Sequence, residues 1–167
     1  MSPDLLTDTA TPLHLPVQAP PAVPDTPALV ERLVRQFGAR WVDEAGFDAW
    51  AAEGGDQVLL FTGDTSRFPE GLDVAVVLPE LQKHFAQRFG LGVVPRASEE
   101  RLARRFGSQR WPTLVFLRQG QYVDALSGML DWEVFVQRVQ AILEQAPRRA
   151  PGVGIPLVAA ADPGSCH

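Results

Sequence analysis

Apolar residues in the middle of the chain follow two spacings, one typical of helices and one typical of strands. Spacings of three and four residues place side chains on one face of a helix, and they occur over residues 27–37, 43–53, 73–89, 98–106 and 132–143. Short continuous or alternating apolar runs predict strands, and they occur at residues 40–42, 58–61, 91–94, 113–117 and 121–126. The predicted order is helix, strand, helix, strand, helix, strand, helix, strand, strand, helix.

Local signals place the ends of several elements. Thr26-Pro27 has the form of a helix cap followed by proline at the first helical position, and Gly38 supplies a stop. Pro79 is expected to kink the helix predicted over 73–89 or to reset its start. Gly120 closes a turn between the last two strands, which predicts a β-hairpin. Alternating helices and strands followed by a hairpin predict an α/β fold with a central mixed sheet and helices on both faces.

Both ends of the chain differ from this middle part. Residues 1–25 are rich in proline and contain no Lys or Arg, which predicts a disordered arm. Residues 146–167 are again rich in proline and glycine and are expected to form a flexible tail, in which the apolar piece 155–158 could dock on the body or on a partner. The folded domain is therefore expected at 26–145.

Charge and hydropathy exclude several classes of protein. The chain has 20 acidic and 15 basic side chains, for a formal net charge of −5, and no dense basic run. Nucleic-acid binding is therefore not expected. No apolar run is long enough to cross a membrane, and the N-terminus lacks the basic start and apolar core of a secretory signal. A cytoplasmic location is expected.

Cysteine usage gives the most informative exclusion. Cys166 is the single cysteine of the 167 residues. One cysteine allows no internal disulfide, no CxxC redox pair and no cysteine-cluster metal site. Neither a metal nor a cofactor is expected from the sequence.

The segment 104–128 resembles thioredoxin. An aromatic-Gly pair is followed by Trp111-Pro112-Thr113, a strand, a Gly turn and a second strand that closes on Gly128. The resemblance implies a cis bond at Trp111-Pro112 and a concave site that presents backbone groups to an extended peptide. Where thioredoxins place their Cys-x-x-Cys helix start, however, this chain has the thiol-free segment 62–69, so thiol–disulfide exchange is excluded.

A closer resemblance covers residues 29–145 and is strongest over 101–135. Its signals are a Cys-free loop followed by several short motifs, namely Arg67, Pro69, Glu70, Leu78-Pro79-Glu80-Leu81, Arg105-Phe106-Gly107, Phe116, Ala125-Leu126-Ser127-Gly128 and Trp132. This joint pattern resembles the hydrogenase expression/formation family (HyaE, HoxO and HupG proteins).

That resemblance implies a thioredoxin-like chaperone rather than an enzyme. Its expected partner is the small-subunit precursor of a nickel-iron membrane-bound hydrogenase, which carries a twin-arginine signal peptide, and a second maturation chaperone is a further candidate partner. Two alternatives stay open at this point. One is an enzyme of another class, such as a peroxidase or transferase, on a thioredoxin scaffold; the other is a stable non-catalytic subunit of an assembly.

The candidate partner-binding residues lie in the Cys-free loop, at the start of the helix after it and beside the predicted cis bond. They are Asp64, Arg67, Phe68, Glu70, Asp73, Arg110, Trp111 and Pro112. Trp111 is expected either to form a contact platform or to pack in the core beside the hairpin. Three of the acidic side chains (Asp64, Glu70 and Asp73) are expected either to form a rim for paired arginines or to be an ordinary solvated loop.

Other chemical groups are given no active role by the sequence. The arginines at 101, 104 and 105 fit a solvated helix face better than a contact surface. His84 has no Cys, His or Asp near it in the sequence and is given no catalytic role, and the terminal Cys166-His167 pair cannot complete a four-ligand metal site.

Overall fold

The structure, a computed structural model, describes residues 26–152. The elements follow the predicted order: α1 (Ala28–Gln36), β1 (Arg40–Trp41), α2 (Phe47–Ala51), β2 (Asp56–Phe61), α3 (Glu70–His84), β3 (Phe89–Val93), α4 (Arg96–Arg105), β4 (Thr113–Arg118), β5 (Gln121–Ser127) and α5 (Trp132–Glu144). Within the described residues, no helix combines the length and the hydropathy that a membrane crossing requires.

The five strands form one mixed sheet in the order β1-β3-β2-β4-β5. β1, β3 and β2 run parallel, whereas β4 is antiparallel to β2 and to β5. The central strand β2 therefore pairs on both edges: Leu59 lies opposite Gly92 on one side and opposite Val115 on the other. This confirms the predicted thioredoxin-like α/β fold.

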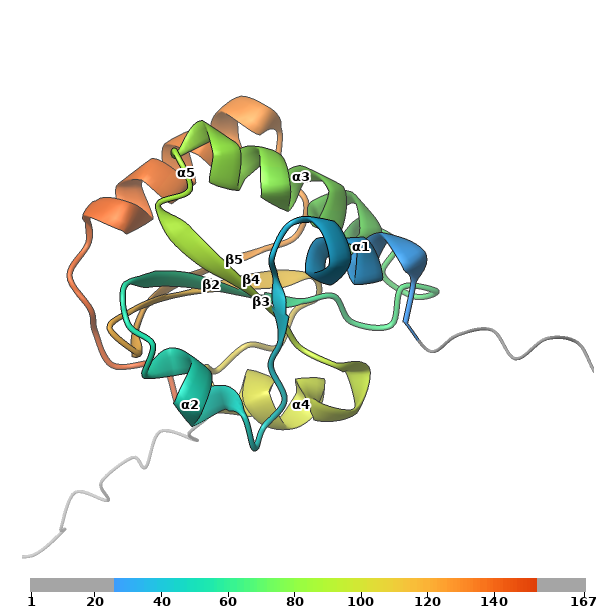
Figure 1. Ribbon diagram of the computed structural model, residues 1–167, viewed down its shortest axis with the longest axis horizontal. Helices are drawn as coiled ribbons and strands as arrows, with labels where there is room; N and C mark the ends of the chain where they lie inside the picture. Colours follow the sequence, from blue (N-terminus) through green and yellow to red (C-terminus); the bar gives the residue numbers. More distant parts are fainter. Residues whose placement is uncertain (1–25, 153–167) are drawn as a thin grey trace, which may run out of the picture.

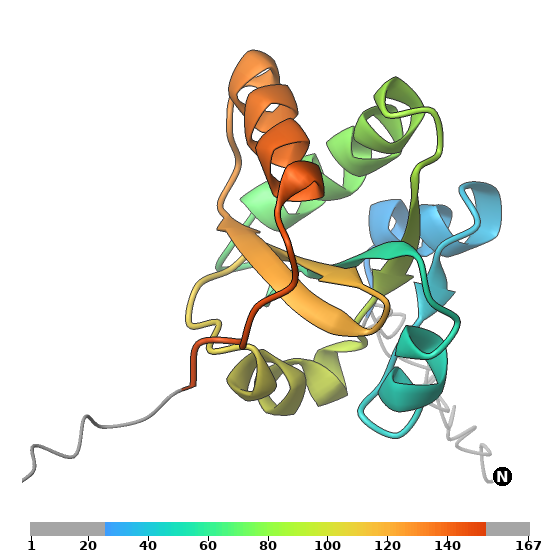
Figure 2. The same ribbon diagram turned by 90° about the vertical axis from the view of Figure 1, so that its left-hand side faces the viewer.

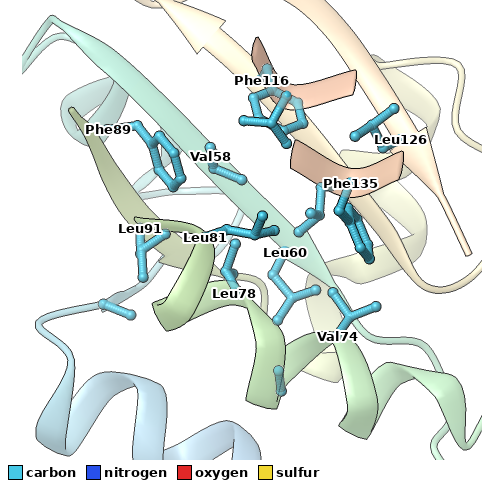
Figure 3. Close-up of a cluster of buried hydrophobic side chains, with 14 of the residues drawn as sticks. Val58, Leu60, Val74, Leu78, Leu81, Phe89, Leu91, Phe116, Leu126 and Phe135 are labelled. Carbon is cyan, nitrogen blue, oxygen red and sulfur yellow. The ribbon is translucent and has the colours of Figure 1, made fainter. Parts of the chain in front are cut away.

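Helices cover both faces of the sheet, with α1, α3 and α5 on one side and α2 and α4 on the other (Figures 1 and 2). Because successive side chains of a strand point to opposite faces, Val58 and Leu60 enter the core under α3 and α5, and Leu59 and Phe61 enter the core over α2 and α4. Figure 3 shows the first core, in which Leu78 and Leu81 of α3 meet the sheet.

Helix α3 differs from its predicted bounds at both ends. It begins at Glu70 and ends at His84, because the chain turns sharply at Ala86 and Gln87, which have φ values of 51° and 59°. The Gln87 amide donates to the Gln82 carbonyl oxygen across this turn, at 2.8 Å. The helix predicted to continue to residue 89 is therefore too long. Pro79 lies within α3 and does not reset its start.

Three other helix starts also differ from the predictions, and that of α2 lies at Phe47, four residues after the predicted start at residue 43. Pro27 is the residue before α1 and has extended backbone angles, so Thr26 is not its cap. α4 begins at Arg96 after an extended Pro95, two residues before the predicted start at Ser98. The earlier start lengthens α4 by about half a turn, and Glu99 lies on the helix face that meets the sheet.

Residues 146–152, which the sequence assigned to a flexible tail, contact the body beside β5 (Figure 2). The Arg148 amide donates to the Tyr122 carbonyl oxygen at 2.7 Å, and Arg148 Nε donates to the Val123 carbonyl oxygen at 2.9 Å. The arm predicted at 1–25 and the tail beyond residue 152, with its apolar piece and Cys166, lie outside the described residues.

Candidate functional site

The candidate site lies at the edge of the sheet where the parallel strands end. In open α/β sheets, ligands bind beyond the carboxyl ends of such strands. β1 ends at Trp41, β3 at Val93 and β2 at Phe61, and antiparallel β4 begins at the same edge with Thr113. The loop that leaves β2 lies between two surfaces of this edge, a pocket on one side and the predicted Trp111-Pro112 surface on the other.

The predicted cis bond is present at Trp111-Pro112, and Trp111 packs directly on the loop. Its indole lies over the bare backbone of Gly63, where an added Cβ would sit 2.6 Å from Trp111 Cδ1. Gly63 also has a φ of +73°, so glycine is required there on two grounds. The Phe68 ring stacks on Trp111 with 6.2 Å between ring centroids, and the Arg67 guanidinium lies 5.8 Å from the Phe68 ring centroid.

The expectation that Trp111 packs beside the core holds in part, and its use as a contact platform stays a prediction. The side chain is half-buried and packs against the core over α2 and α4, yet it keeps a solvent-facing part. Its Nε1 atom is buried without an acceptor among the described residues. An unpaired buried donor is rare in folded proteins, and it sets this indole apart from an ordinary core tryptophan.

The backbone around the cis bond is partly open for pairing. The Pro112 carbonyl oxygen accepts from the Gly128 amide at 2.8 Å, which closes the hairpin side. In contrast, neither the amide nor the carbonyl of Trp111 has a hydrogen-bond partner within residues 26–152. An amide and a carbonyl without an internal partner are groups with which an added peptide strand can pair.

The charged candidates do not form a single cluster. Asp64 shapes the loop, because its Oδ1 accepts from the Ser66 amide at 2.9 Å and its carbonyl accepts from the amides of Arg67 and Phe68. Glu70 and Asp73 are exposed in the first turn of α3, where a negative charge suits the helix dipole.

No ion pair among residues 26–152 involves Arg67, Glu70, Asp73 or Arg110. These four charges therefore remain available to a partner. Whether the acidic side chains act as a rim for arginines stays a prediction.

On the other side of the loop is a pocket of about 590 Å³ that the sequence did not predict. Trp41 at the end of β1 is 42% exposed and forms one wall, and Arg96 at the start of α4 forms another. The remaining lining comes from the start of α1, from Val94 and from loop residues 62–66. Its walls meet only because three strands pair in parallel, which no local pattern reveals.

Beneath the loop lies Glu99, a second residue that sequence analysis missed. Its side chain is fully buried. Glu99 Oε1 accepts from the amides of Thr62 at 2.7 Å and Gly63 at 2.9 Å, and Glu99 Oε2 accepts from Arg96 at 2.9 Å. A signal was present, because Glu99 stands three, four and seven residues before the buried residues Leu102, Ala103 and Phe106.

Other chemical groups lie apart from this edge. Arg101, Arg104 and Arg105 pair with Glu44, Glu100 and Asp48 on the surface, as a solvated helix face does. The His84 ring meets the Trp132 ring edge-on at 5.8 Å. Burial, with Asp124 nearby, raises the pKa of Tyr122 in the hairpin above its usual value.

Within residues 26–152, no three His, Cys, Asp or Glu side chains converge as metal ligands would. At these strand ends the described residues also offer no free acid beside a base for proton transfer. The one buried acid there, Glu99, already accepts hydrogen bonds from two backbone amides, a hydroxyl and an arginine. The edge offers an aromatic surface, free backbone groups and unpaired charges, which suit binding of a peptide segment.

Comparison with known proteins places this architecture among relatives. The family model described as hydrogenase-1 expression protein HyaE matches residues 29–135. The hydrogenase expression/formation protein HoxO of Cupriavidus necator is 50% identical over 149 residues, covering 88% of this chain and 92% of that protein. The hydrogenase expression/formation protein HupG of Bradyrhizobium diazoefficiens is 38% identical over 127 residues, covering 74% and 86%. A crystal structure of a hydrogenase expression/formation protein hupG from Rhodopseudomonas palustris is 36% identical, covers 62% of this chain and 94% of that chain, and has a TM-score of 0.46.

Proposed function

The chain belongs to the hydrogenase expression/formation family of HyaE, HoxO and HupG proteins, and from this premise we propose that it is a cytoplasmic chaperone without redox activity. Its client is the small-subunit precursor of a nickel-iron hydrogenase, held through the twin-arginine signal peptide during maturation. The surface that does this lies beyond the carboxyl ends of the parallel strands and is formed by residues 62–73 and by Arg110, Trp111 and Pro112.

One observation carries the proposal. The Trp111 backbone has an unpaired amide and carbonyl beside the cis Pro112, and the stacked rings of Trp111 and Phe68 stand next to them. An extended peptide gains affinity from backbone pairing and from apolar contact with such rings. A signal peptide is an extended, largely apolar segment, so its chemistry suits this surface.

Charge supports the same client. Glu70 and Asp73 are exposed without an ion pair inside the described residues. Arginine pairs with carboxylates through two parallel hydrogen bonds, which adds geometric specificity to the charge attraction. The paired arginines of the signal peptide therefore have candidate partners beside the aromatic surface, and charge sets specificity more than affinity.

The residues at the end of β2 support the proposed absence of redox activity. The chain continues from Phe61 into Thr62 and Gly63, and its single cysteine is at position 166. Disulfide reduction of the thioredoxin type uses one thiolate of the chain to attack a disulfide and a second thiol of the chain to resolve the mixed disulfide. A hydroxyl such as that of Ser66 cannot take either role.

The direct test is co-purification of the tagged chain with the small-subunit precursor, once with and once without its signal peptide. We expect recovery of the full precursor and loss of most recovery without the signal peptide. Equal recovery of both forms would reject the signal peptide as the binding segment. Persistence of the chain in the mature membrane-bound enzyme would instead indicate a stable subunit, and insulin reduction or peroxide turnover would indicate an enzyme.

A further inference from the structure

Among the described residues, Glu99 is the one acidic or basic side chain with no solvent exposure at all. A carboxylate moved out of water is destabilising unless hydrogen bonds and an opposite charge compensate it. Its position on the inward face of α4, directly below the loop that leaves β2, calls for a physical reason.

The contacts of Glu99 show what the carboxylate does. Oε1 accepts three hydrogen bonds, from the Thr62 amide at 2.7 Å, the Gly63 amide at 2.9 Å and the Thr62 hydroxyl at 3.2 Å. Oε2 accepts from Arg96 at 2.9 Å, and Arg96 also lines the pocket on the other side of the loop. Hydrogen bonds to an ionised acceptor are stronger than neutral ones.

The two amides need this acceptor because the sheet ends just before them. The last pairs of β2 are Leu60 with Val93 on one edge and Phe61 with Thr113 on the other. Thr62 and Gly63 are both buried but lie beyond these pairs, so their amides have no neighbouring strand to donate to. The Glu99 side chain of α4 therefore accepts the hydrogen bonds that a neighbouring strand would otherwise accept. It thereby fixes the direction in which the chain leaves β2.

That direction decides where the aromatic surface stands. The Trp111 indole packs on the backbone of Gly63. The loop that starts at Gly63 brings Phe68 to its stacked position on Trp111. We propose that Glu99 is a positioning residue for partner binding: its buried carboxylate holds Thr62 and Gly63, and through them it sets the Phe68–Trp111 surface. This inference rests on the proposed function, because the partner is the hydrogenase precursor proposed there.

Three variants separate this role from simple stabilisation of the fold. Glu99→Ala removes every acceptor. Glu99→Gln keeps an oxygen for the two amides but makes it a neutral acceptor, and it gives up the ion pair with Arg96, whose side chain is 48% exposed and can turn to water. Gln82→Ala is the matched control, because Gln82 is buried and its Nε2 donates to the Phe89 carbonyl oxygen at 2.8 Å, at the opposite end of the sheet.

The experiment measures the affinity of each full-length variant for the full precursor by titration calorimetry. We expect Glu99→Ala to weaken binding about tenfold or more, as loss of a central contact does, while Gln82→Ala stays within about twofold and Glu99→Gln within about threefold of the parent chain. Equal losses for Glu99→Ala and Gln82→Ala would overturn the proposal, and so would a Glu99→Gln variant as weak as Glu99→Ala.

A second readout keeps this inference separate from the proposed function. In ¹H–¹⁵N spectra of the free protein, Glu99→Ala is expected to shift the Gly63 amide and the Trp111 indole resonances, while Gln82→Ala leaves both in place. If the parent chain does not bind the precursor, the proposed function fails and these spectra alone decide the positioning role; unmoved resonances in Glu99→Ala would reject it. If Glu99→Ala does not fold, Glu99→Asp, which is one CH₂ too short to reach both amides, replaces it with the same expected shifts.

Discussion

A carboxylate accepts hydrogen bonds at each end of the central strand β2, but the charged groups around the two ends differ in whether they are paired. At the amino end, Asp56 accepts from Arg88 Nε at 3.0 Å and from Arg118 Nε at 2.6 Å, and both arginines also donate to the Leu143 carbonyl oxygen. At the carboxyl end, both carboxylate oxygens of Glu99 accept hydrogen bonds. The loop that follows β2, in contrast, carries charges with no ion-pair partner within residues 26–152.

The amino end of β2, around Asp56, is therefore called the closing end, because its charged groups pair with one another. The carboxyl end, around Gly63, is called the presenting end, because its groups face outward. Around Asp56, the charges and the carbonyls at the end of α5 satisfy one another, so this region closes the fold and offers little to a partner. Around Gly63, the fixed backbone holds aromatic rings and charges that face outward. A rigid support below exposed groups is what a binding surface needs. Substitutions at the two ends should therefore differ in how they change the free energy of unfolding and the affinity for the precursor.

Asp56→Ala should destabilise the fold most and leave binding intact. The change leaves two arginines without their carboxylate at the closing end, and loss of such charged hydrogen bonds lowers the free energy of unfolding by about 3 kcal/mol. Urea unfolding measures this loss, and precursor titration measures binding. Asp48→Ala, which removes a pair whose carboxylate is 78% exposed, is the control and should cost less than about 0.5 kcal/mol. A tenfold loss of binding in Asp56→Ala would break the contrast.

Gly63→Ala should damage both stability and binding. The new Cβ would lie 2.6 Å from the Trp111 indole and the residue would keep a φ of +73°, so we expect a loss of about 2 kcal/mol in the free energy of unfolding. Gly38→Ala is the control, since its φ is +68° with nothing within 4 Å of the added Cβ. It should lose about 1 kcal/mol from backbone strain alone. Equal losses in thermal unfolding would mean that Trp111 does not rest on Gly63.

Trp111→Ala should act mainly on binding. The side chain is only half-buried, so its removal costs less stability than removal of a core aromatic, but a central tryptophan often supplies about 2 kcal/mol of binding free energy. We therefore expect an affinity for the precursor about thirtyfold lower. Trp132→Ala, which removes another tryptophan, 40% exposed on α5, should leave affinity unchanged. The same loss in both variants would place the binding surface elsewhere.

The combined Glu70→Gln and Asp73→Asn change should have the smallest effect. Exposed charges contribute little and are screened by salt, so we expect about a threefold loss of affinity at low salt that disappears near 1 M salt. Glu133→Gln, an exposed acid without an ion pair among the described residues, serves as the control. A loss that does not depend on salt would show that these carboxylates do not act through charge.

The fold could be predicted because each element carries its own period. The strand residues Val58 to Phe61 read as one apolar run, since helices cover both faces of β2. The cis bond was predicted from the resemblance of residues 104–128 to thioredoxin, and the structure bears it out. The thiol-free loop was recognised because residues 62–69 depart from the thioredoxin pattern.

The supports of the site could not be predicted in the same way. The helix was predicted to begin at Ser98 and Glu99 was given no role, whereas α4 begins at Arg96 and Glu99 is fully buried. The Trp41 pocket depends on the pairing of β1 with β3, residues about fifty positions apart. Contacts of that range follow from the assembled sheet and leave no local pattern in the sequence.

Hydrogen exchange of the full-length chain, alone and with the precursor bound, tests the central claim most directly. We expect the backbone amides of residues 62–73 and 110–112, at the carboxyl end of β2, to exchange more slowly when the precursor is bound. The amides of residues 86–89 and 118–121, at the other end, should exchange at unchanged rates. Protection confined to the end around Asp56, with none near Trp111, would contradict the central claim.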